Sequence, residues 1–142
     1  MLLGLDPLLT PDLLHALASM GHGDEIALVD ANFPAAAFAR RLIRLDGVDG
    51  NALLSAVLSV LPLDNFVERP VSTMQVVGEP DAIPPTVVDY LEILGAAGST
   101  TPIDPLDRFD FYDRAQNAYA IVITGERRPY GNILLRKGVV FA

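Results

Sequence analysis

The stretch Glu25-Ile-Ala-Leu-Val-Asp30 places four apolar residues between two acidic ones. A run of this length is too short for a helix and is typical of a buried strand. Residues 10–21 before it carry helix signals, because Thr10 can cap the first turn, Pro11 suits that turn and Gly21 can end the helix. We therefore predict a helix followed by a buried strand, which is typical of a layered α/β domain.

The same alternation continues along the chain. Further strands are expected within residues 41–46, 71–77, 119–124 and 132–136. Further helices are expected from Asn51, as the capping residue, through Leu61, and over residues 86–97 and 108–118. The short connection 125–131 between the last two strands indicates that at least one strand has an antiparallel neighbour. We expect residues 1–142 to form a single domain with three α/β/α layers and a mixed sheet.

Composition narrows the class of protein. The absence of cysteine excludes disulfides, thiolate metal sites and cysteine nucleophiles. A net charge of −8 with scattered basic residues argues against nucleic-acid binding. No segment is apolar enough to span a membrane, and no secretory signal is recognisable, so we expect a cytoplasmic protein. The hydrophobic fraction of 51% is high for a small monomer and indicates a homo-oligomer.

Two titratable residues flank the first strand. His22 lies between Gly21 and Gly23, which allow a sharp turn and the close approach of a ligand. The alternative is a loop histidine with both nitrogens in water. Asp30 ends the strand, where ligands of α/β sheets usually bind. Alternatively, its carboxylate caps the following turn through the backbone.

The second half of the chain supplies two further candidates. Arg108 follows two aspartates, so a surface ion pair is the simplest role for it. Tyr130, Gly131 and Asn132 are either an ordinary turn or a polar cluster suited to hydroxyl groups. Two histidines without cysteine give no metal-ligand spacing, and no phosphate-binding or serine-nucleophile motif is present. This set of residues suits a neutral polyhydroxylated ligand.

Four segments together resemble the L-fucose mutarotase/D-ribose pyranase family. They are Met20-Gly-His-Gly-Asp-Glu-Ile26, Asp30-Ala-Asn-Phe-Pro34, Arg108-Phe-Asp-Phe-Tyr-Asp-Arg-Ala-Gln116 and Thr124-Gly-Glu-Arg-Arg-Pro-Tyr-Gly-Asn-Ile133. The match runs in order from Leu13 to Gly138. The Asn-Phe-Pro turn and the segment 109–116 resemble the fucose branch more than the ribose branch.

The resemblance implies a role for each candidate. His22 matches the proton donor, Asp30 and Arg108 match substrate-binding charges, and Tyr130 to Asn132 match the C-terminal sugar-binding segment. We take Tyr130 as the acid/base partner of His22. On this basis His22 and Asp30 should form one wall of a sugar pocket, separated by the strand between them. Phe33 and Tyr119 could pack against the sugar, although core packing is the simpler role for both.

The resemblance also implies an assembly and an activity. Family members form rings, commonly decamers of two pentamers, whose pockets are completed by the C-terminal segment of a neighbour. We therefore expect Tyr130 and Asn132 to act in trans, on a monosaccharide, without a cofactor or metal. The expected reaction is the exchange of the α and β anomers of L-fucose or a related aldose through ring opening. The alternatives are a D-ribose pyranase, a non-catalytic sugar-binding accessory of a transporter, or a ring-forming scaffold.

Overall fold

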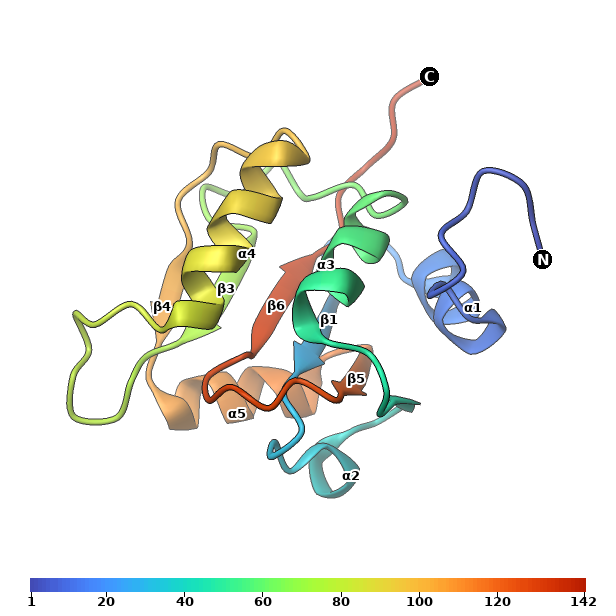
Figure 1. Ribbon diagram of the computed structural model, residues 1–142. Helices are drawn as coiled ribbons and strands as arrows, with labels where there is room; N and C mark the ends of the chain where they lie inside the picture. The colour runs from blue at the N-terminus through green and yellow to red at the C-terminus, as the bar shows by residue number, and fades with distance from the viewer.

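A six-stranded sheet of order β2-β5-β1-β6-β3-β4 runs through the computed structural model, which describes residues 1–142 (Figure 1). The strands are β1 Glu25–Val29, β2 Leu42–Leu45, β3 Val71–Met74, β4 Asp104–Leu106, β5 Ala120–Thr124 and β6 Ile133–Arg136. The helices are α1 Pro11–Ser19, α2 Ala35–Phe38, α3 Gly50–Leu58, α4 Pro85–Ala96 and α5 Arg108–Asn117. None of these helices is long and apolar enough to cross a membrane.

The sheet is mixed, as predicted, but its antiparallel strand pairs differently from the expectation. β1 and β2 each run parallel to β5, and β3 runs parallel to β4. Only β6 is reversed, and it pairs with β1 and β3. The last two strands are therefore not neighbours, because β1 is inserted between them. The loop 125–131 crosses over the end of β1, which brings its residues close to the residue that follows that strand.

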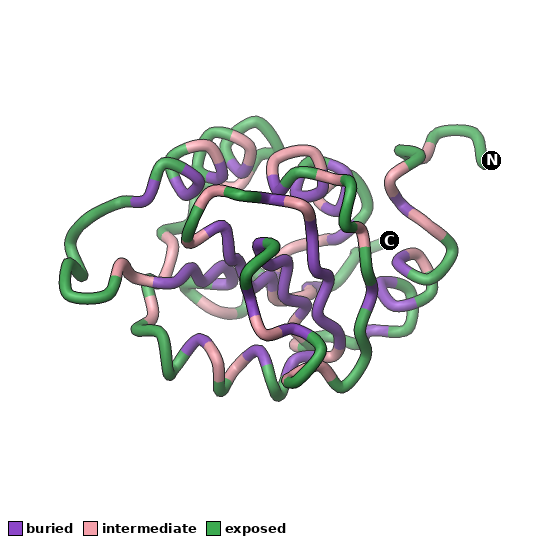
Figure 2. The backbone as a smooth tube through the Cα atoms, turned by 60° about the horizontal axis from the view of Figure 1, so that its bottom comes forward, coloured by how far each residue is buried: buried purple, intermediate pink, exposed green.

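Helices cover both faces of the sheet, which confirms the three-layer prediction. Successive strand residues alternate between two cores, as the period of a strand requires. Ile26, Leu28 and Val122 pack with α1, α3 and α4 on one face. Ala27 and Val29 pack with α2 and α5 on the other. The buried strands lie at the centre of Figure 2, with the exposed turns of the helices outside them.

Side-chain capping explains where α1, α3 and α5 begin. The Thr10 hydroxyl accepts from the Leu13 N–H, as predicted. The predicted cap of α3 was wrong: Asp49 accepts from the Ala52 N–H at 2.7 Å, and α3 begins at Gly50. The amide of Asn51 instead donates to the carboxylate of Asp89 in α4. The short elements α2 and β4 were not predicted, because four and three residues carry too little periodicity.

The strand directions give the sheet two distinct edges. All five parallel strands end, and β6 begins, at what we call the carboxyl edge. The residues after β1 and β4 and the loop 125–131 gather there. The opposite amino edge holds the turn before β1 and the chain that follows β6. Ligands of α/β sheets bind at the carboxyl edge as a rule.

Candidate functional site

His22 lies at the amino edge, in the tight turn between α1 and β1. The turn is closed by the Gly21 N–H, which donates to Asp24, and by Gly23, whose φ of 89° favours glycine. The Nε2 atom of His22 is 3.0 Å from Oδ1 of Asp64. The alternative of a histidine with both nitrogens in water is therefore wrong, although 45% of the side chain is exposed.

Asp64 is a buried carboxylate that holds this imidazole from behind. Its side chain is only 1% exposed and also accepts from the Phe66 N–H and from Arg136 Nε, each at 3.0 Å. Burial raises the pKa of Asp64, but these hydrogen bonds and that of His22 outweigh burial and leave the pKa below its ordinary value. Asp64 is therefore ionised at neutral pH and can only accept a hydrogen bond. His22 Nε2 must carry a proton, so Nδ1 is the nitrogen free to exchange one.

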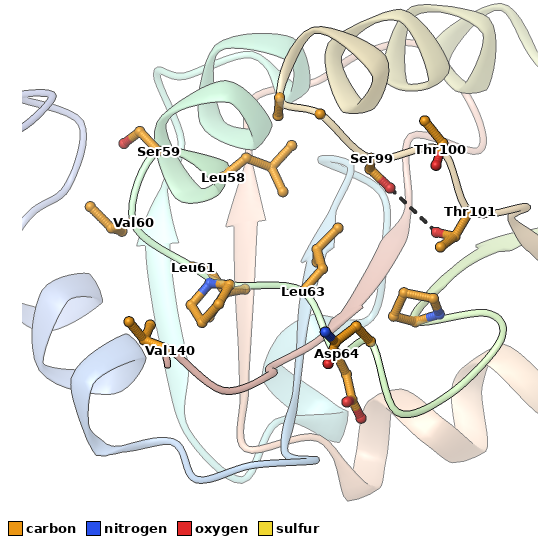
Figure 3. Close-up of a pocket in the computed structure, with 15 residues that line it drawn as sticks. Leu58, Ser59, Val60, Leu61, Leu63, Asp64, Ser99, Thr100, Thr101 and Val140 are labelled. Atoms are coloured by element: carbon orange, nitrogen blue, oxygen red, sulfur yellow. Dashed lines mark hydrogen bonds between the residues drawn. The ribbon is translucent and has the colours of Figure 1, made fainter. Parts of the chain in front are cut away.

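An exposed aromatic ring lies against His22, and a second lies next to the first. The ring of Phe66 lies 5.0 Å from the imidazole and 6.4 Å from the ring of Phe141, and both phenylalanines are mostly exposed. Beside them the surface is hollowed by about 510 Å³, with Asp64 at its border (Figure 3). The hollow is lined by residues 58–65, 97–101, Pro70 and Val140. The amino edge thus presents a histidine beside exposed aromatic rings and a hollow with a mixed polar and apolar lining.

Asp30 lies at the carboxyl edge and is almost fully buried. Its Oδ1 accepts from the Asn32 N–H at 3.0 Å, so the predicted turn cap is present. Its own N–H donates to the side-chain oxygen of Asn132 at 2.9 Å. Burial raises the pKa of Asp30, against the opposing hydrogen bonds from the backbones of Asn32 and Gly131. Such a carboxylate is poised to accept further hydrogen bonds from a ligand.

The turn 130–132 lies beside Asp30, which contacts Gly131 and Asn132. The two alternatives given from the sequence, a turn and a polar cluster, are therefore both present. A Cβ at position 131 would lie 2.9 Å from Glu126 Cγ and 3.4 Å from Asp30 Cβ, which explains the glycine. Tyr130 adopts a φ of 61°, a left-handed conformation that is unusual for a bulky residue. Its hydroxyl accepts from the Val77 N–H at 3.1 Å, which leaves its own proton free to donate.

Arg108 borders the same region. It is the first residue of α5 and lines a hollow of about 420 Å³ together with residues 75–78, the segment that includes Val77. Its guanidinium lies 4.8 Å from the ring of Phe109 and forms no ion pair within the chain. The simplest role given to it from sequence, a surface ion pair, is therefore wrong. The free guanidinium can donate to ligand hydroxyls.

One expectation about this site needs correction. Within one chain His22 and Asp30 do not form a single wall, because they lie beyond opposite ends of β1. The five residues of β1 span about 16 Å at the usual rise of a strand, far more than a monosaccharide ring. Asp30 groups with Tyr130 and Asn132, whereas His22 groups with Asp64. Within one chain the candidate residues therefore form two separate groups, one at each edge of the sheet.

Two aromatic candidates have structural roles. Phe33 is buried between Phe38, Phe111 and Tyr112, in edge-to-face contacts, so core packing is the correct alternative. Tyr119 precedes β5 at the amino edge, and its ring lies under the guanidinium of Arg41 at 3.9 Å. Asp64, which the sequence analysis missed, has no motif around it. Its only signal is a charge that directly follows the apolar run Leu61-Pro-Leu63.

The model of the RbsD / FucU transport protein family matches residues 3–140. The chain belongs to this family. The fucose mutarotase of Homo sapiens is 47% identical, over 96% of this chain and 93% of that protein. The L-fucose mutarotase of Histophilus somni is 46% identical, over 98% of this chain and 97% of that protein. The structure of the Streptococcus pneumoniae fucose mutarotase in complex with L-fucose superposes with a TM-score of 0.93 at 45% identity, covering 99% of this chain and all of that one.

Proposed function

We propose that this protein is an L-fucose mutarotase that interconverts the α and β anomers of its sugar. The observation that carries the proposal is the pair of half-sites: a histidine backed by a buried carboxylate, and a buried cluster suited to hydroxyl groups. The relatives named fucose mutarotase, at 46–47% identity over nearly the whole chain, support the same activity.

The chemistry follows from what anomer exchange requires. One group takes the proton of the anomeric hydroxyl while another delivers a proton to the ring oxygen, and the C1–O5 bond breaks to give the open aldehyde. Rotation about C1–C2 presents the other carbonyl face, and the reverse proton transfers close the ring. We assign these transfers to His22 Nδ1 and the Tyr130 hydroxyl, because each has its other hydrogen-bonding position already occupied by the protein.

The remaining residues orient the sugar. Asp30 can accept from two hydroxyl groups, while Arg108 and the Asn132 amide can donate to others. Gly131 contributes to the site through packing, because the absence of a side chain lets this turn lie directly against Glu126 and Asp30. No residue of this set requires a cofactor or a metal for these contacts.

We infer that each pocket is shared between two copies of the chain. A monosaccharide cannot touch His22 and Asp30 of the same chain, so one copy supplies the amino edge and another the carboxyl edge. Exposed apolar side chains border both edges and are suited to such an interface: Phe66 and Phe141 near His22, and Val77 and Phe109 near Arg108 and Tyr130. Tyr130 and Asn132 then act in trans to His22. The family resemblance favours a decamer of two pentameric rings in the cytoplasm, and the cysteine-free sequence suits that compartment.

Saturation-transfer NMR on L-fucose, with D-ribose in parallel, tests the activity. We expect anomer exchange of L-fucose faster than in buffer, and a loss of about 10²–10⁴-fold in His22→Ala, the usual contribution of a positioned acid or base. His15→Ala is the matched control, because His15 is the only other histidine and lies exposed on α1.

Three results would contradict the assignment. Exchange no faster than in buffer for either sugar would leave a sugar-binding accessory. Interconversion of pyranose and furanose ribose without any effect on L-fucose would favour the pyranase. Full activity in His22→Ala would overturn the role of this histidine.

A further inference from the structure

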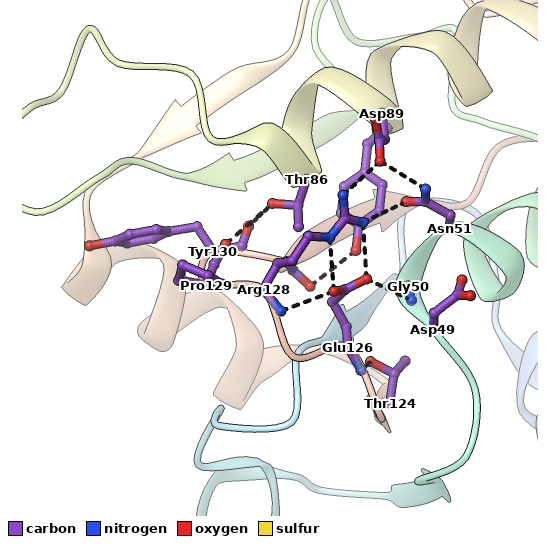
Figure 4. A network of polar contacts seen from close by, with 12 residues as sticks. Asp49, Gly50, Asn51, Thr86, Asp89, Thr124, Glu126, Arg128, Pro129 and Tyr130 are labelled. Carbon is purple, nitrogen blue, oxygen red and sulfur yellow. Dashed lines mark hydrogen bonds and ion pairs between the residues drawn. The ribbon is translucent and has the colours of Figure 1, made fainter.

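A polar network lies next to the turn formed by residues 130–132. None of its side chains takes part in the proton transfers proposed for His22 and Tyr130. We call it the Arg128 network: Glu126, Arg128, Asp89 and Asn51 (Figure 4). Arg128 donates to both carboxylate oxygens of Glu126 at 3.0 and 3.1 Å, to Asp89 at 2.8 Å and to the Asn51 side chain at 3.3 Å. One guanidinium thus ties the loop 125–131 to α3 and α4.

The central ion pair of this network is largely shielded from water. The Glu126 side chain is 6% exposed, and it also accepts from the backbone N–H groups of Gly50 and Arg128. The Arg128 guanidinium is the main reason that the pKa of Glu126 lies below its ordinary value. A buried carboxylate with this many donors is held in one position, and so is the backbone on either side of it.

The network is joined to the sugar-binding residues by short contacts. The carbonyl of Glu126 accepts from the N–H of Ala31, the residue after Asp30, at 2.9 Å. The Glu126 side chain fills the space that a Cβ at position 131 would need. The hydroxyl of Thr86 donates to the Tyr130 carbonyl at 3.2 Å. The backbone from 126 to 131 is therefore fixed on both sides of the turn.

The fixed backbone of residues 126–131 maintains the conformation of Tyr130. A tyrosine with a positive φ is strained and persists only where its surroundings determine it. In Figure 4 the Tyr130 ring points away from the network, so Arg128 acts on it through the backbone and not by side-chain contact. Without the network we expect the turn to relax to ordinary φ values, which would turn the phenol out of the pocket.

We propose that Arg128 is a positioning residue, which holds the turn so that Tyr130 and Asn132 face the sugar beside Asp30. This inference rests on the proposed mutarotase function, since it assigns Arg128 to the carboxyl-edge half of that site. The competing role is purely structural, with the network merely stabilising the packing of α3 and α4 against the sheet.

The neighbouring arginine provides a matched control. Arg127 is exposed and forms no hydrogen bond or ion pair within the chain, whereas the Arg128 side chain forms four hydrogen bonds. Arg128→Met and Arg127→Met remove the same charge from adjacent positions. We expect Arg128→Met to lower kcat/KM for L-fucose about tenfold to a hundredfold. The reason is that Tyr130 would then adopt its strained conformation in only a minority of the molecules. Arg127→Met should remain within twofold of the unmodified protein, with activity normalised to folded protein by circular dichroism.

Mixing of subunits separates positioning from general stabilisation. In oligomers reassembled from Arg128→Met and His22→Ala chains, some pockets combine an intact amino edge with an intact carboxyl edge, so activity should recover. Mixtures of Arg128→Met with Asp30→Asn chains should not recover, because both changes damage the same half-site. Equal recovery in the two mixtures, or kcat/KM unchanged in folded Arg128→Met, would overturn the proposal.

Two further measurements cover the cases in which Arg128→Met does not fold or the proposed function is wrong. If Arg128→Met does not fold, Asp89→Ala removes one hydrogen-bond acceptor of the network from a partly exposed position and should raise KM about threefold. An unchanged KM in folded Asp89→Ala would then overturn the proposal. Failure of the proposed function is distinguishable, because the unmodified protein itself would then fail to accelerate anomer exchange.

Discussion

The separation of His22 and Asp30 by the length of β1 makes a quantitative prediction about mixed oligomers. His22→Ala damages the amino edge of every chain, and Asp30→Asn damages the carboxyl edge. Homo-oligomers of either variant therefore lack an intact pocket. When the two variants are unfolded together and reassembled at equal concentration, a pocket is intact only if its amino edge comes from an Asp30→Asn chain and its carboxyl edge from a His22→Ala chain.

The expected activity follows from counting. Each of these choices has a probability of one half, so about one quarter of the pockets are intact in any symmetric assembly that pairs the two edges. The anomer exchange rate of each variant alone should be about tenfold to a hundredfold below that of the unmodified protein. A quarter of the normal exchange rate is therefore well above the rate of either variant. Saturation-transfer NMR on L-fucose measures the rate, and native mass spectrometry confirms that hybrid oligomers have formed.

One result would refute the reasoning. If hybrid oligomers form and their exchange rate equals only the mean of the two variants, both residues act within one chain. The half-sites inferred from the opposite ends of β1 would then be wrong. A sedimentation measurement that finds only monomers in an active preparation would lead to the same conclusion.

Three further changes test individual contacts. Asp64→Asn removes the charge behind His22 and should lower the exchange rate about tenfold or more. Asp30→Asn should raise the thermal midpoint at pH 7 while abolishing sugar binding, because burial raises the pKa of Asp30 and the charged form lowers native stability there. Asp49→Ala removes the cap of α3 and should lower the free energy of unfolding by about 1 kcal/mol in urea.

The pH dependence of the Asp30 variant has a definite sign. A native pKa above the unfolded value of 3.8 means that the native state binds the proton more tightly. The gain in stability of Asp30→Asn should therefore be complete at neutral pH, shrink as the pH falls through the native pKa and vanish below about 3.8. A gain that stays constant down to pH 3 would contradict this sign.

Controls exist for the other two changes. Glu68→Gln removes a charge from an exposed residue four positions after Asp64 and should leave the exchange rate unchanged. Asp46→Ala breaks only an exposed ion pair with Arg44, so it should change the free energy of unfolding by less than about 0.5 kcal/mol. A loss in either control as large as in its partner variant would refute the specific contact.

Most elements of the fold could be predicted from the sequence because their signals are local. The helix at 11–19 is set by its Thr10 cap and Pro11, and the strand at 25–29 by its uninterrupted apolar residues. The family motifs likewise predict His22, Asp30, Arg108 and the turn 130–132 as site residues, since each motif is a short local segment. The order of the strands was not predictable in this way, since a short loop between two strands does not reveal that β1 lies between them.

The sequence by itself thus determined which residue types are available and in which elements they lie. Only the tertiary structure decided how they are grouped. It placed Asp64 against His22 across 42 positions, joined Asp30 to Asn132 across 102, and separated the two groups by the length of a strand. Such pairings depend on the strand order and on the crossing of β6 between β1 and β3. They are long-range contacts that neither periodicity nor capping encodes, because those signals act over only a few residues.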